Sequence, residues 1–195
     1  MVVTLVWVAS FGSASGTLNL SARDSADIQR IEAYLNSLKT LRSRFVQISA
    51  GNFAEGVIYI DRPNKLRLEY TIPSHIQVYA NGFWLTHVDN ELEAVWHTPI
   101  KATPATFLVR DTIALNGDIS VKGLDRKPGS ISIELAHTKH PGTGRFVLIF
   151  SDDPLNLRKW TITDAQGVST SVTLMAAEFN VAIPGAVFVF DETKF

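Results

Sequence analysis

Five histidines and one pair of adjacent aspartates are the side chains of this sequence best suited to catalysis or metal binding. The histidines are His75, His87, His97, His137 and His140. None of them forms the paired helical spacing that zinc enzymes use, so we expect no metal site. Asp152 and Asp153 are neighbours, which in a strand would point to opposite faces and could not share a proton or a substrate.

Phosphate-binding and nucleophilic motifs are also missing. Gly142-Thr143-Gly144 lacks the third glycine and the lysine of a phosphate-binding loop. No glycine-x-serine-x-glycine elbow occurs, and the absence of cysteine excludes a thiol nucleophile, a disulfide and a zinc-thiolate site. The sequence therefore predicts a protein that is not an enzyme and needs no cofactor.

The composition indicates a globular protein. The chain has 195 residues, of which 46% are hydrophobic and 19% charged, enough for one domain with a core of its own. Its 18 lysines and arginines nearly balance 19 aspartates and glutamates, so no strong basic field exists and we expect no nucleic-acid partner.

The first residues are typical of a targeting segment. An apolar run from Val2 to Phe11 is followed by the small residues Gly12 to Gly16, a pattern that resembles a secretory signal. The run is too short to span a bilayer as a helix. We predict a signal peptide or disordered segment over residues 1–24, a single domain over 25–195, and export from the cytoplasm.

One long helix is predicted from Asp27 to Ser49. Its apolar side chains recur at spacings of three and four, and Ser25 or Asp27 can cap its start. They are Ile28, Ile31, Leu35, Leu38, Leu41 and Phe45. One face of this helix must therefore lie on an apolar surface.

After Gly51 the period changes to two, which predicts about eleven strands. They are Gly56–Ile60, Lys65–Tyr70, His75–Ala80, Phe83–Asp89, Glu91–His97, Ile119–Lys122, Ile131–His137, Arg145–Ser151, Lys159–Asp164, Ser169–Glu178 and Val187–Phe190. Short turns between them favour antiparallel pairing. A second, short helix is expected from Ala105 to Leu115, opened by Thr103-Pro104.

The strands alternate in polarity. Leu66, Leu68 and Tyr70 share one face of their strand, while Lys65, Arg67 and Glu69 share the other. A sheet of this size tends to curl, and the helices can cover its concave side. Two outcomes fit the pattern: a solid core, or a hollow wide enough for an apolar ligand.

Several stretches carry a family resemblance. They are Gly56 to Tyr70 with its Arg62-Pro63 turn, Asn81-Gly82 followed by Trp84, the Thr103-Pro104 helix with Phe107-Leu108, and Asp153-Pro154-Leu155 through Trp160 to Gly167. Their order and spacing, over roughly Ile28 to Phe190, resemble the LolA family of outer-membrane lipoprotein carrier proteins.

The resemblance implies a fold and a task. The fold is a mainly β, unclosed antiparallel barrel in which an N-terminal helix and a short inserted helix form a lid over an apolar cavity. The task is periplasmic: a monomeric chaperone accepts lipoproteins from an inner-membrane ATP-driven release complex and delivers them to an outer-membrane acceptor. In the family an arginine of the arginine-proline turn tethers the lid, here Arg62, and a bulky residue shortly after it, here Leu66, contacts ligand or partner.

The leading hypothesis is therefore a carrier of acyl chains. Exposing such a chain to water costs about 0.8 kcal/mol per CH₂, so crossing an aqueous space requires a shelter. The expected lining consists of Leu66, Leu68, Tyr70, Val78, Leu92, Trp96 and Phe107. An alternative is a sensor domain on a similar barrel that recognises lipidated or misfolded envelope proteins; an enzyme is the third class considered.

Overall fold

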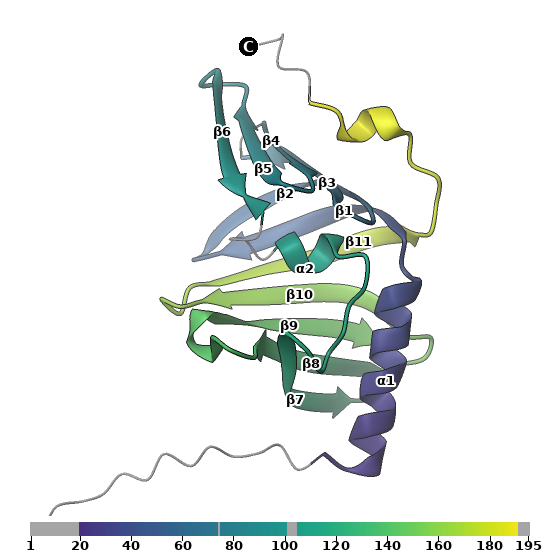
Figure 1. The fold of residues 1–195 in the computed structure, drawn as a ribbon. Helices are drawn as coiled ribbons and strands as arrows, with labels where there is room; N and C mark the ends of the chain where they lie inside the picture. The colour runs from purple at the N-terminus through teal and green to yellow at the C-terminus, as the bar shows by residue number, and fades with distance from the viewer. Residues whose placement is uncertain (1–19, 74, 101–104, 191–195) are drawn as a thin grey trace, which may run out of the picture.

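The chain folds around one open antiparallel sheet. The computed structural model describes residues 20–73, 75–100 and 105–190, and its sheet has the strand order β6-β5-β4-β3-β2-β1-β11-β10-β9-β8-β7 (Figure 1). The strands are β1 (Thr40–Ser49), β2 (Asn52–Asp61), β3 (Lys65–Ile72), β4 (Ile76–Asn81), β5 (Trp84–Asp89), β6 (Ala94–Pro99), β7 (Ile119–Lys127), β8 (Ser130–His137), β9 (Gly144–Ser151), β10 (Asn156–Asp164) and β11 (Ser169–Phe179). β6 and β7 lie at the two edges and do not meet, so the predicted unclosed barrel is confirmed.

The N-terminal helix, α1, runs from Ala22 to Ser37 and begins earlier than predicted. Its cap is Ser21, not Ser25 or Asp27. The backbone N–H of Asp24 donates to Ser21 Oγ at 3.1 Å, and the Asp24 carboxylate accepts from the Ser21 backbone N–H at 2.9 Å. This reciprocal capping box fixes the first turn. The helix thus starts inside the predicted N-terminal segment 1–24, of which residues 1–19 lie outside the described residues.

The prediction that this helix continues to Ser49 is wrong. Residues Thr40–Ser49 form β1, which pairs with β2 on one side and β11 on the other. Leu38, Leu41 and Phe45 fit a helical stripe, but Leu41, Ser43 and Phe45 also alternate as the buried positions of a strand. Pairing along both edges of β1 satisfies the backbone of a central strand, and this long-range gain overrides the local helical pattern.

The inserted helix, α2, is shorter than predicted. It spans Ala105–Val109 rather than continuing to Leu115, while its predicted opening at Thr103-Pro104 lies outside the described residues. The chain beyond it stays close to the core, since Ile113 and Leu115 are buried. Burial of these two side chains explains why their apolar pattern resembled a continuing helix.

The prediction of a last strand over Val187–Phe190 is also wrong. The chain there forms a short 3₁₀ helix, η3 (Gly185–Phe188), against the convex face of β3 and β4. Phe188 is buried beneath Lys65, whose Nζ lies 5.9 Å from the ring centroid. Arg67 Nη1 donates to the Val187 carbonyl at 3.3 Å. This segment therefore packs on the outer face of the sheet and does not pair with an edge strand.

The core lies between the concave face of the sheet and the two helices. Ile31 and Leu35 of α1 and Phe107 and Leu108 of α2 pack in one cluster with side chains of the strands. Strand members of this cluster that are at most 2% exposed are Phe45, Ile58, Leu66, Ala80, Ile131, Ile133, Leu135, Leu148 and Phe150. Among the described helices, none has the length and apolar character needed to cross a membrane.

Gly56 occupies a position in β2 where no side chain fits. It lies between Phe45 and Tyr70 in the register, and those rings meet edge to face at 5.2 Å. A Cβ on Gly56 would lie 2.1 Å from the backbone oxygen of Glu69. Only glycine lets the two strands approach this closely.

We expect Gly56→Ala to lower the free energy of unfolding by about 3 kcal/mol, because the clash is with backbone that cannot rotate away. Urea denaturation followed by circular dichroism measures the change. Gly117→Ala is the control, since a Cβ there meets nothing within 4 Å, and equal effects of the two variants would contradict this account of Gly56.

Candidate functional site

The turn between β2 and β3 is fastened to the ends of both helices. It runs from Asp61 to Lys65, whose side chains pair at 2.8 Å, and Asn64 adopts a φ of +71° that asparagine tolerates well. The Arg62 backbone N–H donates to the Lys39 carbonyl at 2.9 Å, just after α1, and the Asn64 backbone N–H donates to the Val109 carbonyl at 2.9 Å, at the end of α2. The turn is therefore built against the helices and is not a surface loop.

Arg62 extends this attachment with its guanidinium. Nε donates to the Leu108 carbonyl at 2.8 Å, and Nη1 donates to the Leu35 carbonyl at 2.6 Å and to the Leu38 carbonyl at 3.4 Å. These carbonyls lie at helix C-termini, where the backbone lacks donors of its own and the dipole favours a cation. One side chain thus holds both helices. Burial lowers the pKa of Arg62 from its ordinary value, and the guanidinium nevertheless keeps its charge in proteins.

A small cavity lies in the interior next to Arg62. It measures about 20 Å³ and is lined by Leu38, Lys39, Thr40, Leu41, Ile60, Arg62, Leu108, Leu157 and Trp160. That volume suits a single water. Larger depressions of about 540 and 420 Å³ open to solvent and have Ile48 and Val168, or Lys122 and Arg145, among their walls. The described side chains of the helices and the sheet pack in one cluster in this conformation, and an apolar hollow under the helices stays a prediction.

Asn36 ties α1 to the segment that follows α2. Its side-chain amide donates to the Ile113 carbonyl at 2.9 Å and accepts from the Ile113 N–H at 2.8 Å. One turn earlier, Glu32 Oε2 accepts from the Leu115 N–H at 2.8 Å. The segment after α2 is thus bonded along α1, and together with the two helices it covers the core.

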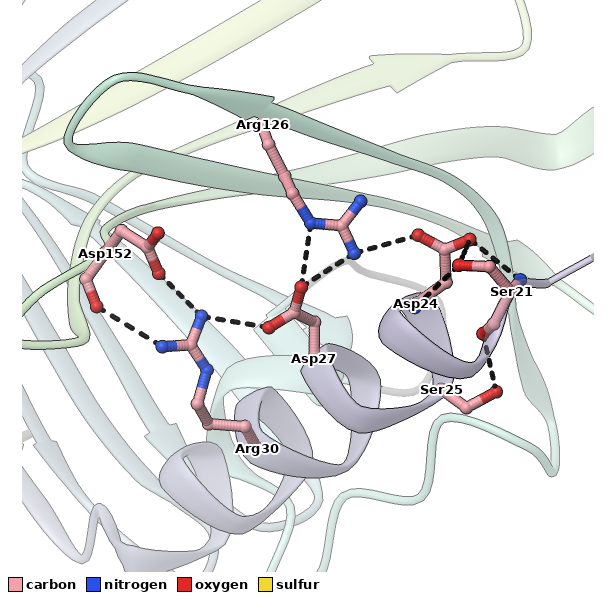
Figure 2. Close-up of polar contacts among 7 residues, drawn as sticks. All are labelled: Ser21, Asp24, Ser25, Asp27, Arg30, Arg126 and Asp152. Atoms are coloured by element: carbon pink, nitrogen blue, oxygen red, sulfur yellow. Dashed lines mark hydrogen bonds and ion pairs between the residues drawn. The ribbon is translucent and has the colours of Figure 1, made fainter.

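An ionic cluster holds the other end of α1 to the sheet (Figure 2). Arg126 of β7 reaches two carboxylates of the helix: its Nη2 lies 2.8 Å from Asp24 Oδ1 and 2.6 Å from Asp27 Oδ2. Arg30 then joins Asp27, at 3.1 Å, to Asp152 in the turn between β9 and β10, at 2.6 Å. All these groups are at least partly exposed, so salt screens their attraction.

The structure locates most of the predicted lining residues in the core region. Leu66, Val78 and Phe107 are buried. Leu68 and Tyr70 are partly buried and pack against the core. The alternation of β3 thus indicated the correct inner face, and the role of these side chains in contacting acyl chains stays a prediction.

Leu92 and Trp96 do not lie in the core. Leu92 falls in the turn between β5 and β6 and is 75% exposed, so its predicted placement inside is wrong. Trp96 lies on the concave side of the sheet, as expected, because it pairs in register with His87, which pairs with Val78. It is still 43% exposed, since the buried cluster does not extend to β6.

Sequence reasoning missed Asn36 and the cluster around Arg126. Asn36 carried no signal, because its partner is a backbone group 77 residues away. The serine-x-x-aspartate pattern of Ser21 and Asp24 could have revealed the helix start. Among the described residues, no group of three or more histidine, aspartate or glutamate side chains is arranged to hold a metal ion.

Comparisons with known proteins agree on one family. The family of outer membrane lipoprotein carrier protein LolA matches residues 36–191. An outer-membrane lipoprotein carrier protein of Methylococcus capsulatus is 26% identical over 190 residues, covering 88% of this chain and 91% of its own. The carrier of Pseudomonas paraeruginosa is 27% identical over 198 residues, covering 91% and 89%.

Solved structures share the fold at low identity. A conserved protein of Thermus thermophilus superposes with a TM-score of 0.53 at 11% identity, covering 86% of this chain and 95% of its own. MucB superposes with a TM-score of 0.52 at 16% identity, covering 88% of this chain and 64% of its own. At such identities these structures support the architecture alone.

We expect the ionic cluster to make the free energy of unfolding depend on pH in the acidic range. The pKa of Asp24 is lowered to about 2, first because its carboxylate accepts hydrogen bonds from Ser21 and then because of Arg126. Since the folded pKa lies below the unfolded value of about 3.9, this contribution is complete above pH 4 and is lost as the pH falls toward 2.

The measurement is urea denaturation of the wild type and Asp24→Asn at pH 6 and at pH 2.5. The wild type should be the more stable at pH 6, and the difference should shrink at pH 2.5. Asp111→Asn, at an exposed carboxylate beyond α2, is the control and should show no such change. A gap between wild type and Asp24→Asn that is the same at both pH values would contradict the assignment.

Proposed function

This chain belongs to the LolA family of outer membrane lipoprotein carrier proteins, and from that premise we propose that it binds the acyl chains of lipoproteins beneath α1 and α2 and delivers them to the outer membrane. Proteins of this family are carriers and not enzymes, and they work in the periplasm. The finer steps proposed for this chain are acceptance of cargo from an inner-membrane ATP-driven release complex and transfer to an outer-membrane acceptor.

The observation that carries the proposal is the hold of Arg62 on both helices. Its guanidinium bonds to carbonyls of α1 and α2, which together cover the apolar concave face. These bonds do not depend on which side chains lie beneath. Because Arg62 belongs to the β2–β3 turn, breaking its bonds releases both helices from the sheet and exposes Leu66, Val78 and their neighbours.

The free energy gained by burying an acyl chain and the free energy lost by opening the helices are of comparable size. Burying a sixteen-carbon acyl chain stabilises by about 12 kcal/mol, at about 0.8 kcal/mol per CH₂. Against this, opening breaks the bonds of Arg62, worth about 1.5–3 kcal/mol each for a charged donor, and separates the helices from the core. Acyl chains can therefore open the layer, while a closed core that fills itself favours their release.

This competition explains how a carrier can both hold and deliver. When cargo leaves, Ile31, Leu35, Phe107 and Leu108 return to the apolar surface of the sheet. The hydrogen bonds of Arg62 form again at the same time. Closure thus compensates for the apolar burial that is lost with the cargo, and no external energy source is required at the acceptor.

We expect Arg62→Leu to bind acylated cargo normally and to deliver it poorly, because the closed state loses its charged donor while the apolar surface is intact. The measurement is transfer of a radiolabelled lipoprotein from the purified complex to outer-membrane vesicles, with at least a tenfold slower rate for the variant. That factor corresponds to about 1.4 kcal/mol of lost closure energy.

The matched control is Arg145→Leu, which removes an arginine that is 60% exposed and lies 3.7 Å from Glu134 on β8. It should transfer cargo as the wild type does. Delivery by Arg62→Leu at the rate of this control would refute the role of Arg62, and failure of the wild type to bind acylated cargo at all would refute the carrier function.

A further inference from the structure

The two edge strands of the sheet differ in charge and in the regularity of their pairing. β7 carries Lys122, Asp125, Arg126 and Lys127 and has a register shift between Val121 and Gly123. Charges and bulges of this kind prevent an edge strand from pairing with another chain. The opposite edge, β6, consists of Ala94-Val95-Trp96-His97-Thr98-Pro99, with no aspartate, glutamate, lysine or arginine and a regular register with β5.

The backbone of β6 presents hydrogen-bonding groups outward. Ile100 donates its backbone N–H to the Phe83 carbonyl across the β5–β6 pair at 3.1 Å. Because orientation alternates along an antiparallel strand, Val95 and His97 direct their N–H and C=O groups away from β5. Pro99 has the same parity and needs no donor there, as expected at an outer edge. Among the described residues no strand lies beyond β6.

The concave side of this edge is continuous with the core. Leu68, Val78, His87 and Trp96 pair in register across β3, β4, β5 and β6, so their side chains form one row. Exposure along the row rises from buried Val78 to Trp96 at 43%. The Trp96 ring stacks on His87, with centroids 5.1 Å apart and planes within 2°. The row therefore leads from beneath the helices to the free edge.

We propose that β6 binds, as an added strand, the extended polypeptide segment that follows the acylated residue of a cargo lipoprotein. This inference rests on the proposed carrier function. With acyl chains under the helices, as proposed above, the row offers the attached chain a path past Trp96 to β6. Main-chain hydrogen bonds to Val95 and His97 would hold it without requiring a particular sequence, which suits a carrier of many cargoes.

The test compares two dye-labelled probes by fluorescence anisotropy. One is a triacylated cysteine amide without a tail, and the other is the same cysteine followed by ten residues rich in serine, threonine and valine. On the wild type the tail should tighten binding about tenfold, the factor for one or two net backbone hydrogen bonds. The same tail with alternate N-methylated residues should lose this gain.

The variant pair is His97→Pro and His97→Ala. Both remove the imidazole and its contact of 2.9 Å with Thr86, and only proline removes the outward N–H. We expect His97→Pro to lose the tenfold gain from the tail and His97→Ala to keep it. The probe without a tail should bind both variants alike, which also shows that they are folded.

Each other result has a defined meaning. If the tail adds nothing on the wild type, or if N-methylation does not matter, strand addition at β6 is overturned while the carrier function stands. If the probe without a tail does not bind at all, the carrier function itself fails. If the wild type is a dimer by analytical ultracentrifugation and His97→Pro is a monomer, the occupant of β6 is a second copy and the cargo assignment is overturned.

Discussion

The structure depends on covering the apolar concave face of an open sheet. The strands of this sheet other than β6 contribute side chains to the core on that face, and two α-helices, of 16 and 5 residues, cover it among the described residues. Both helices pack on the core through apolar side chains, and polar attachments fix them in addition. Arg62 meets their C-terminal carbonyls, Asn36 bonds α1 to the segment after α2, and Arg126 anchors the start of α1. Burial under these helices is thus conditional on a small number of hydrogen bonds.

The attachments differ in their physical character. Arg62 acts on backbone carbonyls in a partly buried site, where the charge is weakly screened and the bonds are strong. The cluster of Asp24, Asp27, Arg30 and Arg126 lies near the surface, where salt and acid weaken it. The two ends of α1 are therefore held by interactions that respond to different conditions. Opening the layer at one end does not require opening it at the other.

A closed interior changes what transport means for this fold. The described core side chains pack in one cluster without cargo, and the cavity beside Arg62 measures about 20 Å³. Binding then exchanges contacts between the helices and the sheet for contacts between the acyl chain and the sheet. The affinity reflects the difference between the free energies of these two kinds of apolar burial. The same balance applies at the sheet edges, where β7 is blocked by charge and α1, while β6 extends beyond the helices with its backbone groups directed outward.

The sequence by itself determined the elements whose patterns are local. Alternation located β3 and its inner face, and turn residues separated the strands, while the role expected of Arg62 came from the resemblance to the LolA family. The tertiary structure decided whatever depended on distant partners. Thr40–Ser49 became a strand because β2 and β11 lie on either side of it, although Leu38, Leu41 and Phe45 fit a helix. Leu92 is exposed because it lies in the turn between β5 and β6. Trp96 is partly exposed because the buried cluster does not extend to β6. A pattern of apolar residues states which side chains avoid water, and only the packed chain determines what covers them.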